Sequence, residues 1–445
     1  MLGTRDRRIL ALAIPATVTL VADPLMGLVD TAVVGRLGAV ELGALGLSVA
    51  VLSTVAWIFN FLVYGTTSTV ARAVGAGDQQ AAGRRIVHAA QVALFLGVLV
   101  GFSLYLAAPG LIRALGAVDE LVEPAVTYLR IRAVGVPLVL LAYVGHGAFR
   151  GVSDTRTPLG VAVGANVVNA GLTYLLVFPV GLGLAGAAWA TVAAEAVAVL
   201  AFAVLFRRVG LPLVGHGAPT RKQLIALVVV SRDLFLRTGG LLLGLLAITA
   251  AAARIGAVPA AAHQVLFQTF MLISFLMDGF AIAGQAMVGT ALGAGDEDEA
   301  RSTGRALLRW GVGGGAVMAV LLLAAMPFGA RVLTDDPAVI AAATAVWWLM
   351  AAGQLINGPV FALDGVLMGA EDFAYLRTWT VVAAFVGGAG GQLVATAGGG
   401  LLGLWLAVQA MMLLRLLSLV LRLRGDGWTR TGAALVSAPD ADSGR

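Results

Sequence analysis

The chain has 445 residues, of which 60% are hydrophobic and 12% charged, whereas soluble globular proteins carry about 25% charged residues. The mean hydropathy of +0.94 excludes an ordinary soluble protein, and the absence of cysteine excludes disulfides, thiolate metal sites and cysteine nucleophiles. The net charge of +5 lies mostly between apolar runs, so it indicates membrane topology rather than nucleic-acid binding.

Repeated apolar runs of about twenty residues or more predict membrane-spanning helices, and the alternation typical of an outer-membrane barrel is absent. We expect an all-α polytopic membrane protein with twelve transmembrane helices. Their expected ranges are 9–35, 42–71, 87–109, 126–149, 158–180, 183–206, 234–256, 260–292, 306–328, 338–368, 376–397 and 400–422. The expected domains are an N-terminal lobe (1–208, helices one to six), a cytoplasmic inter-lobe loop (209–232), a C-terminal lobe (233–424, helices seven to twelve) and a polar cytoplasmic tail (425–445).

Basic residues concentrate in alternate segments between these helices. Twenty-three of the 29 Lys and Arg residues fall on the side that holds both termini. The six on the other side are Arg36, Arg113, Arg130, Arg132, Arg254 and Arg331. Because short basic loops stay in the cytoplasm, we expect both termini there and a multi-pass protein in the plasma (inner) membrane of a prokaryote.

The two halves of the chain repeat at a constant offset of 218 residues. Residues 36–40 (RLGAV) recur as 254–258 (RIGAV), and residues 75–78 (GAGD) recur identically as 293–296. Gly135, Gly147, Gly151 and Asp154 recur as Gly353, Gly365, Gly369 and Asp372. Since each half holds an even number of helices, the repeat is parallel, with a pseudo-two-fold axis along the membrane normal. Such repeats usually place the substrate site between the lobes.

Ionisable side chains inside spans are costly and mark candidate functional sites. Asp23 and Asp30 lie on the first helix, within about 20° of one face, and Pro24 between them favours a kink. Each acid has the alternative of a structural hydrogen bond or ion pair. The second half offers Asp278 and Asp364, whose repeat partners are Asn60 and His146.

Residues 23–31 (DPLMGLVDT) and 35–38 (GRLG) resemble the first helix of the multidrug and toxin extrusion (MATE) family, and most closely its DinF-like subgroup. Residues 261–264 (AAHQ), 278–283 (DGFAIA) and 293–296 (GAGD) add to the resemblance, which covers essentially all twelve spans. It implies two six-helix lobes around a central cavity. It also implies secondary antiport that exports amphipathic, often cationic, small molecules against inward movement of protons or sodium.

The resemblance also suggests the site. Asp30 matches the acid that the family uses as proton or cation acceptor, Asn169 matches a polar Asn, and Tyr128 and Thr191 match two further polar positions. Thr173 stands where the family has a second acid, which favours protons over sodium at Asp30.

Helix geometry supports this grouping, because Asp30, Thr173 and Thr191 each lie roughly 8–12 Å from the outer ends of their helices. Further candidates are Asp23, Asn166, Glu195, Asp278 and Asp364. For Glu195, one turn beyond Thr191, a second carboxylate and a helix-packing hydrogen bond are equally open.

Other functions fit the sequence less well. A major-facilitator transporter is an alternative because Gly75, Asp78 and residues 83–85 (GRR) loosely copy its loop motif, although the spacing differs. A flippase of a lipid-linked precursor from the same superfamily is the nearer alternative. We expect no enzyme, since the four histidines are scattered singly, and no cofactor or metal beyond a sodium ion at Asp30. The expected partners are a small-molecule substrate and the lipid bilayer, with no nucleic acid and a monomeric protein.

Overall fold

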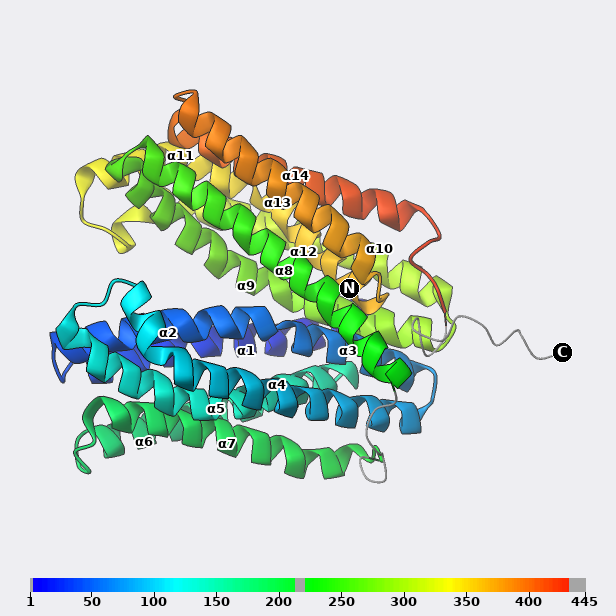
Figure 1. Cartoon of the computed structure of the whole chain (residues 1–445). Helices are drawn as coiled ribbons and strands as arrows, with labels where there is room; N and C mark the ends of the chain where they lie inside the picture. The colour runs from blue at the N-terminus through cyan, green and yellow to red at the C-terminus, as the bar shows by residue number, and fades with distance from the viewer. Residues whose placement is uncertain (1–2, 213–220, 432–445) are drawn as a thin grey trace. The chain divides into compact units, whose positions relative to one another are not determined.

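The computed structural model describes residues 3–212 and 221–431, without the side chains of residues 22–26, 28, 221–228 and 231. The described residues form helices joined by short turns (Figure 1). They divide into two compact units. The N-terminal unit is Val18–Leu224, and the C-terminal unit is Ile225–Arg445 together with Met1–Thr17. The prediction assigned residues 1–208 to one lobe, whereas residues 3–17 group with the C-terminal unit.

The N-terminal unit is a bundle built around α5. Its helices are α1 (Thr4–Val34, from Val18), α2 (Ala39–Phe59), α3 (Phe61–Gly75), α4 (Gln79–Ala114), α5 (Asp119–Gly151), α6 (Arg156–Val177) and α7 (Gly183–Val209). Helix α5 packs against α2, α3, α4 and α7, and α6 pairs with α7. The hydroxyl of Ser48 on α2 donates a hydrogen bond to the carbonyl of Ala125 on α5 at 3.0 Å. Helix α5 therefore brings the polar side chains of several neighbours to one place.

The C-terminal unit repeats this order. Its helices are α8 (Arg221–Ile255), α9 (Ala257–Gly293), α10 (Glu297–Ala325), η1 (Ala330–Val332), α11 (Pro337–Ala352), α12 (Gln354–Gly369), α13 (Phe373–Thr396) and α14 (Gly400–Arg424). Helix α12 packs against α9, α10 and α14, and α13 pairs with α14. Its core holds Trp347 and Trp405, both at most 2% exposed.

The predicted all-α fold of twelve membrane-spanning helices is confirmed. Ten helical segments among the described residues are long and apolar enough to cross a membrane, with α2 and α3 counted together. Helices α11 and α12 pass the same test together, as a pair that bends by 49° at its junction. Helix α1, which was predicted to be the first span, is 31 residues long.

The backbone repeats at the offset found in the sequence. Gly77 and Gly295 both adopt the left-handed conformation, with φ of 71° and 79°, which glycine adopts without strain. The next residue, Asp78 or Asp296, then caps the following helix by accepting a hydrogen bond from a backbone N–H at 2.7 or 2.8 Å. The two halves thus share the turn that starts their third span.

The halves differ in where their helices break. Helices α2 and α3 are separated at Asn60, whereas α9 continues through the repeat partner Asp278. Conversely, α5 is continuous through Gly135, whereas α11 and α12 break at the equivalent Gly353. The chemistry of the two units therefore diverges along with their helix geometry.

Residues near both ends of the described chain contact side chains of α10. Arg5 forms an ion pair with Glu299 at 2.6 Å, and Asp6 accepts a hydrogen bond from the indole of Trp310 at 3.0 Å. From the other end, Asp426 pairs with Arg301 at 2.7 Å, and Trp428 is 2% exposed. In the first part of the predicted polar tail, Trp428 and Thr429 are buried, while residues 432–445 lie outside the described residues.

Close helix packing depends on glycine at a few contacts. A Cβ at Gly147 on α5 would lie 2.6 Å from the carbonyl oxygen of Val63 and 2.8 Å from the Cβ of Thr66, both on α3. The repeat partner Gly365 meets the backbone of Ala281 in the same way. Glycine lets the helix backbones approach at both positions.

We expect Gly147→Ala to lower the thermal midpoint of the purified protein by several degrees, because overpacking a filled contact costs about 1–3 kcal/mol. Gly171→Ala on α6 is the matched control, since nothing lies within 4 Å of its added methyl group, and it should leave the midpoint unchanged or slightly higher. Thermal unfolding in detergent measures both. Equal midpoints for wild type and Gly147→Ala would contradict the packing argument.

Candidate functional site

Asp30 lies near the end of α1 and is 8% exposed. Its Oδ1 accepts a hydrogen bond of 3.2 Å from the hydroxyl of Thr173 on α6, which is fully buried. Thr173, which the resemblance places where a second acid was expected, is therefore the direct partner of Asp30. A hydroxyl orients the carboxylate without adding a second negative charge.

A second hydrogen bond links the next two helices. Asn169 lies one turn before Thr173 on the same face of α6, and its amide donates to the hydroxyl of Thr191 on α7 at 3.1 Å. Thr191 in turn donates to the carbonyl of Ala187 at 3.0 Å. The side-chain oxygen of Asn169 is buried and has no hydrogen-bond partner among the described residues. It is available to a proton donor or a cation.

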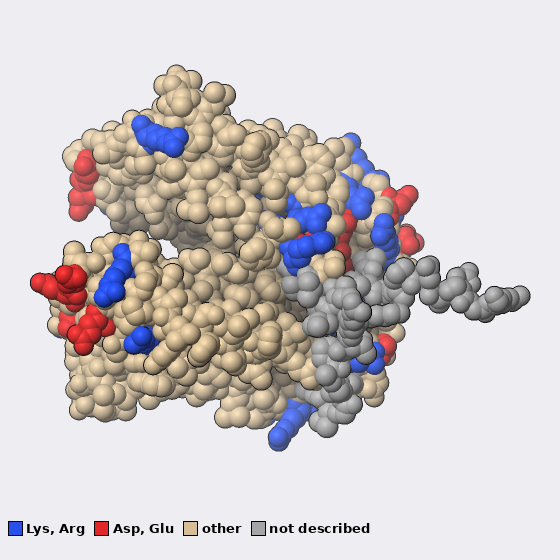
Figure 2. All heavy atoms as spheres, in the orientation of Figure 1, with Lys and Arg blue, Asp and Glu red and all other residues tan. Residues whose placement is uncertain are grey.

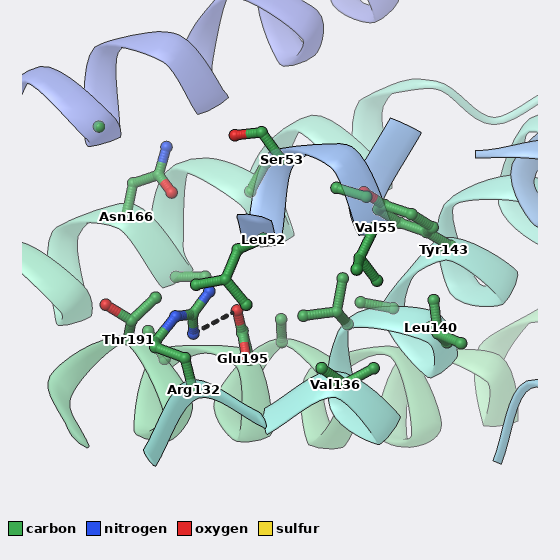
Figure 3. A pocket seen from close by; sticks show the side chains of 18 of the residues that line it. Leu52, Ser53, Val55, Arg132, Val136, Leu140, Tyr143, Asn166, Thr191 and Glu195 are labelled. Atoms are coloured by element: carbon green, nitrogen blue, oxygen red, sulfur yellow. Dashed lines mark hydrogen bonds and ion pairs between the residues drawn. The ribbon is translucent and has the colours of Figure 1, made fainter. Parts of the chain in front are cut away.

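These groups adjoin a cavity of about 330 Å³ inside the N-terminal unit. The side chains that line it come from five helices, and Figure 3 shows ten of them by label. Asp30, Tyr128, Asn166, Thr191 and Glu195 all line it. The structure thus brings together most of the predicted N-terminal candidates, which stay predictions as functional residues. The side chain of Asp23 lies outside the described residues.

An ion pair crosses the cavity wall between α5 and α7. The guanidinium of Arg132 lies 2.8 Å from Oε1 of Glu195, and these side chains are 13% and 17% exposed. Figure 3 shows the pair beside Thr191. Glu195, left open between two roles, is thus both an ion-pair partner and part of the cavity lining. Tyr128 lies one turn before Arg132 and is 3% exposed.

Sequence reasoning missed Arg132 as a member of the site. It was counted with the basic residues on the outer side of the membrane, although it lies inside the expected span 126–149 and, in the structure, within α5. The available signal was spacing, because Arg132 lies four residues after Tyr128, just as Glu195 lies four after Thr191. Four further arginines were assigned to the cytoplasmic side of the membrane, yet the structure buries all four: Arg72, Arg150, Arg237 and Arg415.

Asp364 in the C-terminal unit belongs to a different kind of cluster. Its Oδ2 pairs with Arg237 on α8 at 2.7 Å and also with Arg415 on α14. Asp278 on α9 is half-buried and interacts electrostatically with Arg415. Two guanidinium groups on one carboxylate cross-link helices, which favours the ion-pair alternative for Asp364.

The site could bind a single small cation through neutral and charged oxygens. Asp30 supplies a carboxylate that is hydrogen-bonded to Thr173, and Asn169, one turn from Thr173 on α6, supplies an amide oxygen and is bonded to Thr191. Among the described residues, no three His, Asp or Glu side chains gather as they would around a transition metal.

Comparison with known proteins places the chain in a family. The family model MatE matches residues 15–175 and 241–393. The chain is 33% identical to Protein DETOXIFICATION 44, chloroplastic, of Arabidopsis thaliana, over 99% of this chain and 86% of that protein. It is 30% identical to DNA damage-inducible protein F of Escherichia coli, over 94% of this chain and 92% of that protein.

The fold agrees with solved structures as well. A crystal structure described as MATE in the bent conformation superposes with a TM-score of 0.88 at 21% identity, covering 95% of both chains. The family model covers more than half of the chain, in both of its repeats. The chain therefore belongs to the MatE family of multidrug and toxin extrusion transporters, and within it to the DinF-like subgroup.

Proposed function

We propose that this multi-pass membrane transporter is a secondary antiporter that exports amphipathic, cationic small molecules in exchange for protons. The observation that carries the proposal is Asp30, a nearly buried carboxylate at the edge of a cavity inside one unit. A carboxylate that is partly removed from water can bind and release a proton as its solvation changes. The proteins named NorM and PmpM among the relatives are described as multidrug resistance proteins, which supports drug efflux.

The cavity supports a small molecule over a lipid-linked precursor. Its volume of about 330 Å³ lies at the lower end of the range for small-molecule sites, about 300–1,000 Å³. The lining is largely apolar, with charged groups at a few points, which suits an amphipathic ligand.

Protons are favoured over sodium at Asp30 because of Thr173. Hard cations prefer several oxygen ligands, with carboxylates prominent among them. Thr173 donates a hydrogen bond to Asp30. Its hydroxyl therefore stabilises the carboxylate as a neutral donor and does not supply a second carboxylate for a cation. A proton needs only the one carboxylate.

We expect Asp30→Asn to reduce gradient-driven export at least tenfold, since the amide keeps the shape of the side chain but cannot carry a proton. An ion that binds two conformations equally does not shift the equilibrium between them. Because Asn at position 30 cannot bind and release a proton, the variant should lose the coupling of export to the proton gradient. The measurement is drug export in proteoliposomes under imposed proton and sodium gradients. Asp335→Asn, at an exposed carboxylate of the C-terminal unit, is the control and should export normally. Export by Asp30→Asn at the wild-type rate would remove Asp30 from the mechanism, and export that requires sodium alone would reject the proton.

We further propose that both termini lie in the cytoplasm of a prokaryotic cell, because basic residues outside the membrane are biased to that side. The chain has no cysteine, so single cysteines can be labelled without a background. In intact cells an impermeant maleimide should label Asp335→Cys, whereas Thr431→Cys should react only after permeabilisation. The reverse pattern would overturn the orientation.

A further inference from the structure

The cavity of the N-terminal unit is lined by an unequal set of charges. Among the described residues that line it, the acids are Asp30 and Glu195, and the one guanidinium is Arg132. His146 also lines it and packs edge-on against Phe202, with ring centroids 4.9 Å apart. Arg132 and Glu195 neutralise each other at 2.8 Å. An ionised Asp30 is then the uncompensated charge of the cavity.

The position of Glu195 is built into the packing of α5 and α7. A Cβ at Gly135 would lie 2.7 Å from Oε2 of Glu195 and 3.0 Å from a methyl group of Val192. Glycine at 135 therefore leaves the space that the carboxylate occupies. Oε2 itself is buried without a hydrogen-bond partner among the described residues, whereas Oε1 holds Arg132.

We propose that the Arg132–Glu195 pair is the charge-selectivity element of this cavity. Glu195 cancels Arg132, so Asp30 attracts a ligand with a single positive charge; without Glu195, Arg132 would cancel Asp30 and admit neutral or anionic ligands instead. The inference rests on the proposed function in one respect, that the exported compound enters this cavity. It adds residues that fix the charge of the substrate, whichever ion drives transport.

The magnitude follows from electrostatics in a partly buried site. One unit charge that is added or removed within several ångströms, at an effective dielectric constant of about 20, alters binding of a charged ligand by roughly tenfold or more. The same change leaves an uncharged ligand almost unaffected. Charge and shape can therefore be separated with ligands of one size.

The test is equilibrium binding in detergent at pH 8 with three phenyl-substituted probes. Tetraphenylphosphonium is the cation, tetraphenylborate is the anion of nearly the same shape, and triphenylphosphine oxide is the neutral reference. We expect Glu195→Gln to weaken binding of the cation at least tenfold and to strengthen binding of the anion. Arg132→Gln should do the opposite. The double variant Arg132→Gln with Glu195→Gln should return both affinities to within about threefold of wild type, because its net charge is unchanged.

The double variant separates selectivity from structure. If the pair only holds α5 to α7, both single variants and the double variant should weaken all three probes alike, and the proposal is then overturned. Glu120→Gln, at an exposed acid in the first turn of α5, is the control and should bind all probes as wild type does. If Glu195→Gln does not give a monodisperse protein, the other two variants still test the proposal. Arg132→Gln should bind the cation more tightly than wild type, and the double variant should return its affinity to near the wild-type value.

Transport separates this inference from the proposed function. A wild-type protein that fails to exchange tetraphenylphosphonium for protons, while its variants keep the charge-dependent order of binding, would refute the antiport and leave the selectivity element standing. If Glu195→Gln exchanges both the cation and the neutral probe for protons at the wild-type rate, the antiport stands and the selectivity element is refuted.

Discussion

A polar side chain in the hydrocarbon core has no water to bind, and the organisation of this protein follows from that constraint. Each backbone group is satisfied within its own helix, so the remaining polar side chains must find partners on neighbouring helices or face a cavity. Asn169 on α6 donates to Thr191 on the next helix, α7, and Thr173 donates to Asp30 on α1, which is distant in sequence. Polar groups thus gather where helices converge, as they do around the cavity that α5 lines together with α1, α2, α6 and α7.

The same constraint explains how far the sequence could predict the structure. Spans, repeat and fold class are set by long apolar runs and by recurring glycines such as Gly77 and Gly295, whose backbone conformation leaves little choice. The similar depth of Asp30 and Thr173 could be anticipated, because helix length gives the depth of a residue. Their hydrogen bond, like the other pairings across helices, could not, since depth does not give the rotation of one helix against another.

Arginine was the main source of error for that reason. A guanidinium near the end of an apolar run can extend to the membrane surface or turn inward to an acid, and the sequence reads the same in both cases. Arg132, Arg237 and Arg415 all turn inward. Asp364 accordingly changed from a candidate ion site into the centre of an ion-paired cross-link. Only the partner on the facing helix distinguishes these outcomes.

The two units therefore treat buried charge differently, and this asymmetry bears on how the protein tolerates change. Breaking one arm of the Asp364 cluster leaves an uncompensated charge in the core, which is strongly destabilising. By contrast, the α2 wall of the cavity presents Leu52, Ser53 and Val55, none of which takes part in an ion pair among the described residues. Libraries of variants that aim to broaden or redirect the substrate range are placed best at these α2 positions, where substitutions cost little stability. The C-terminal unit is best left unchanged in such libraries.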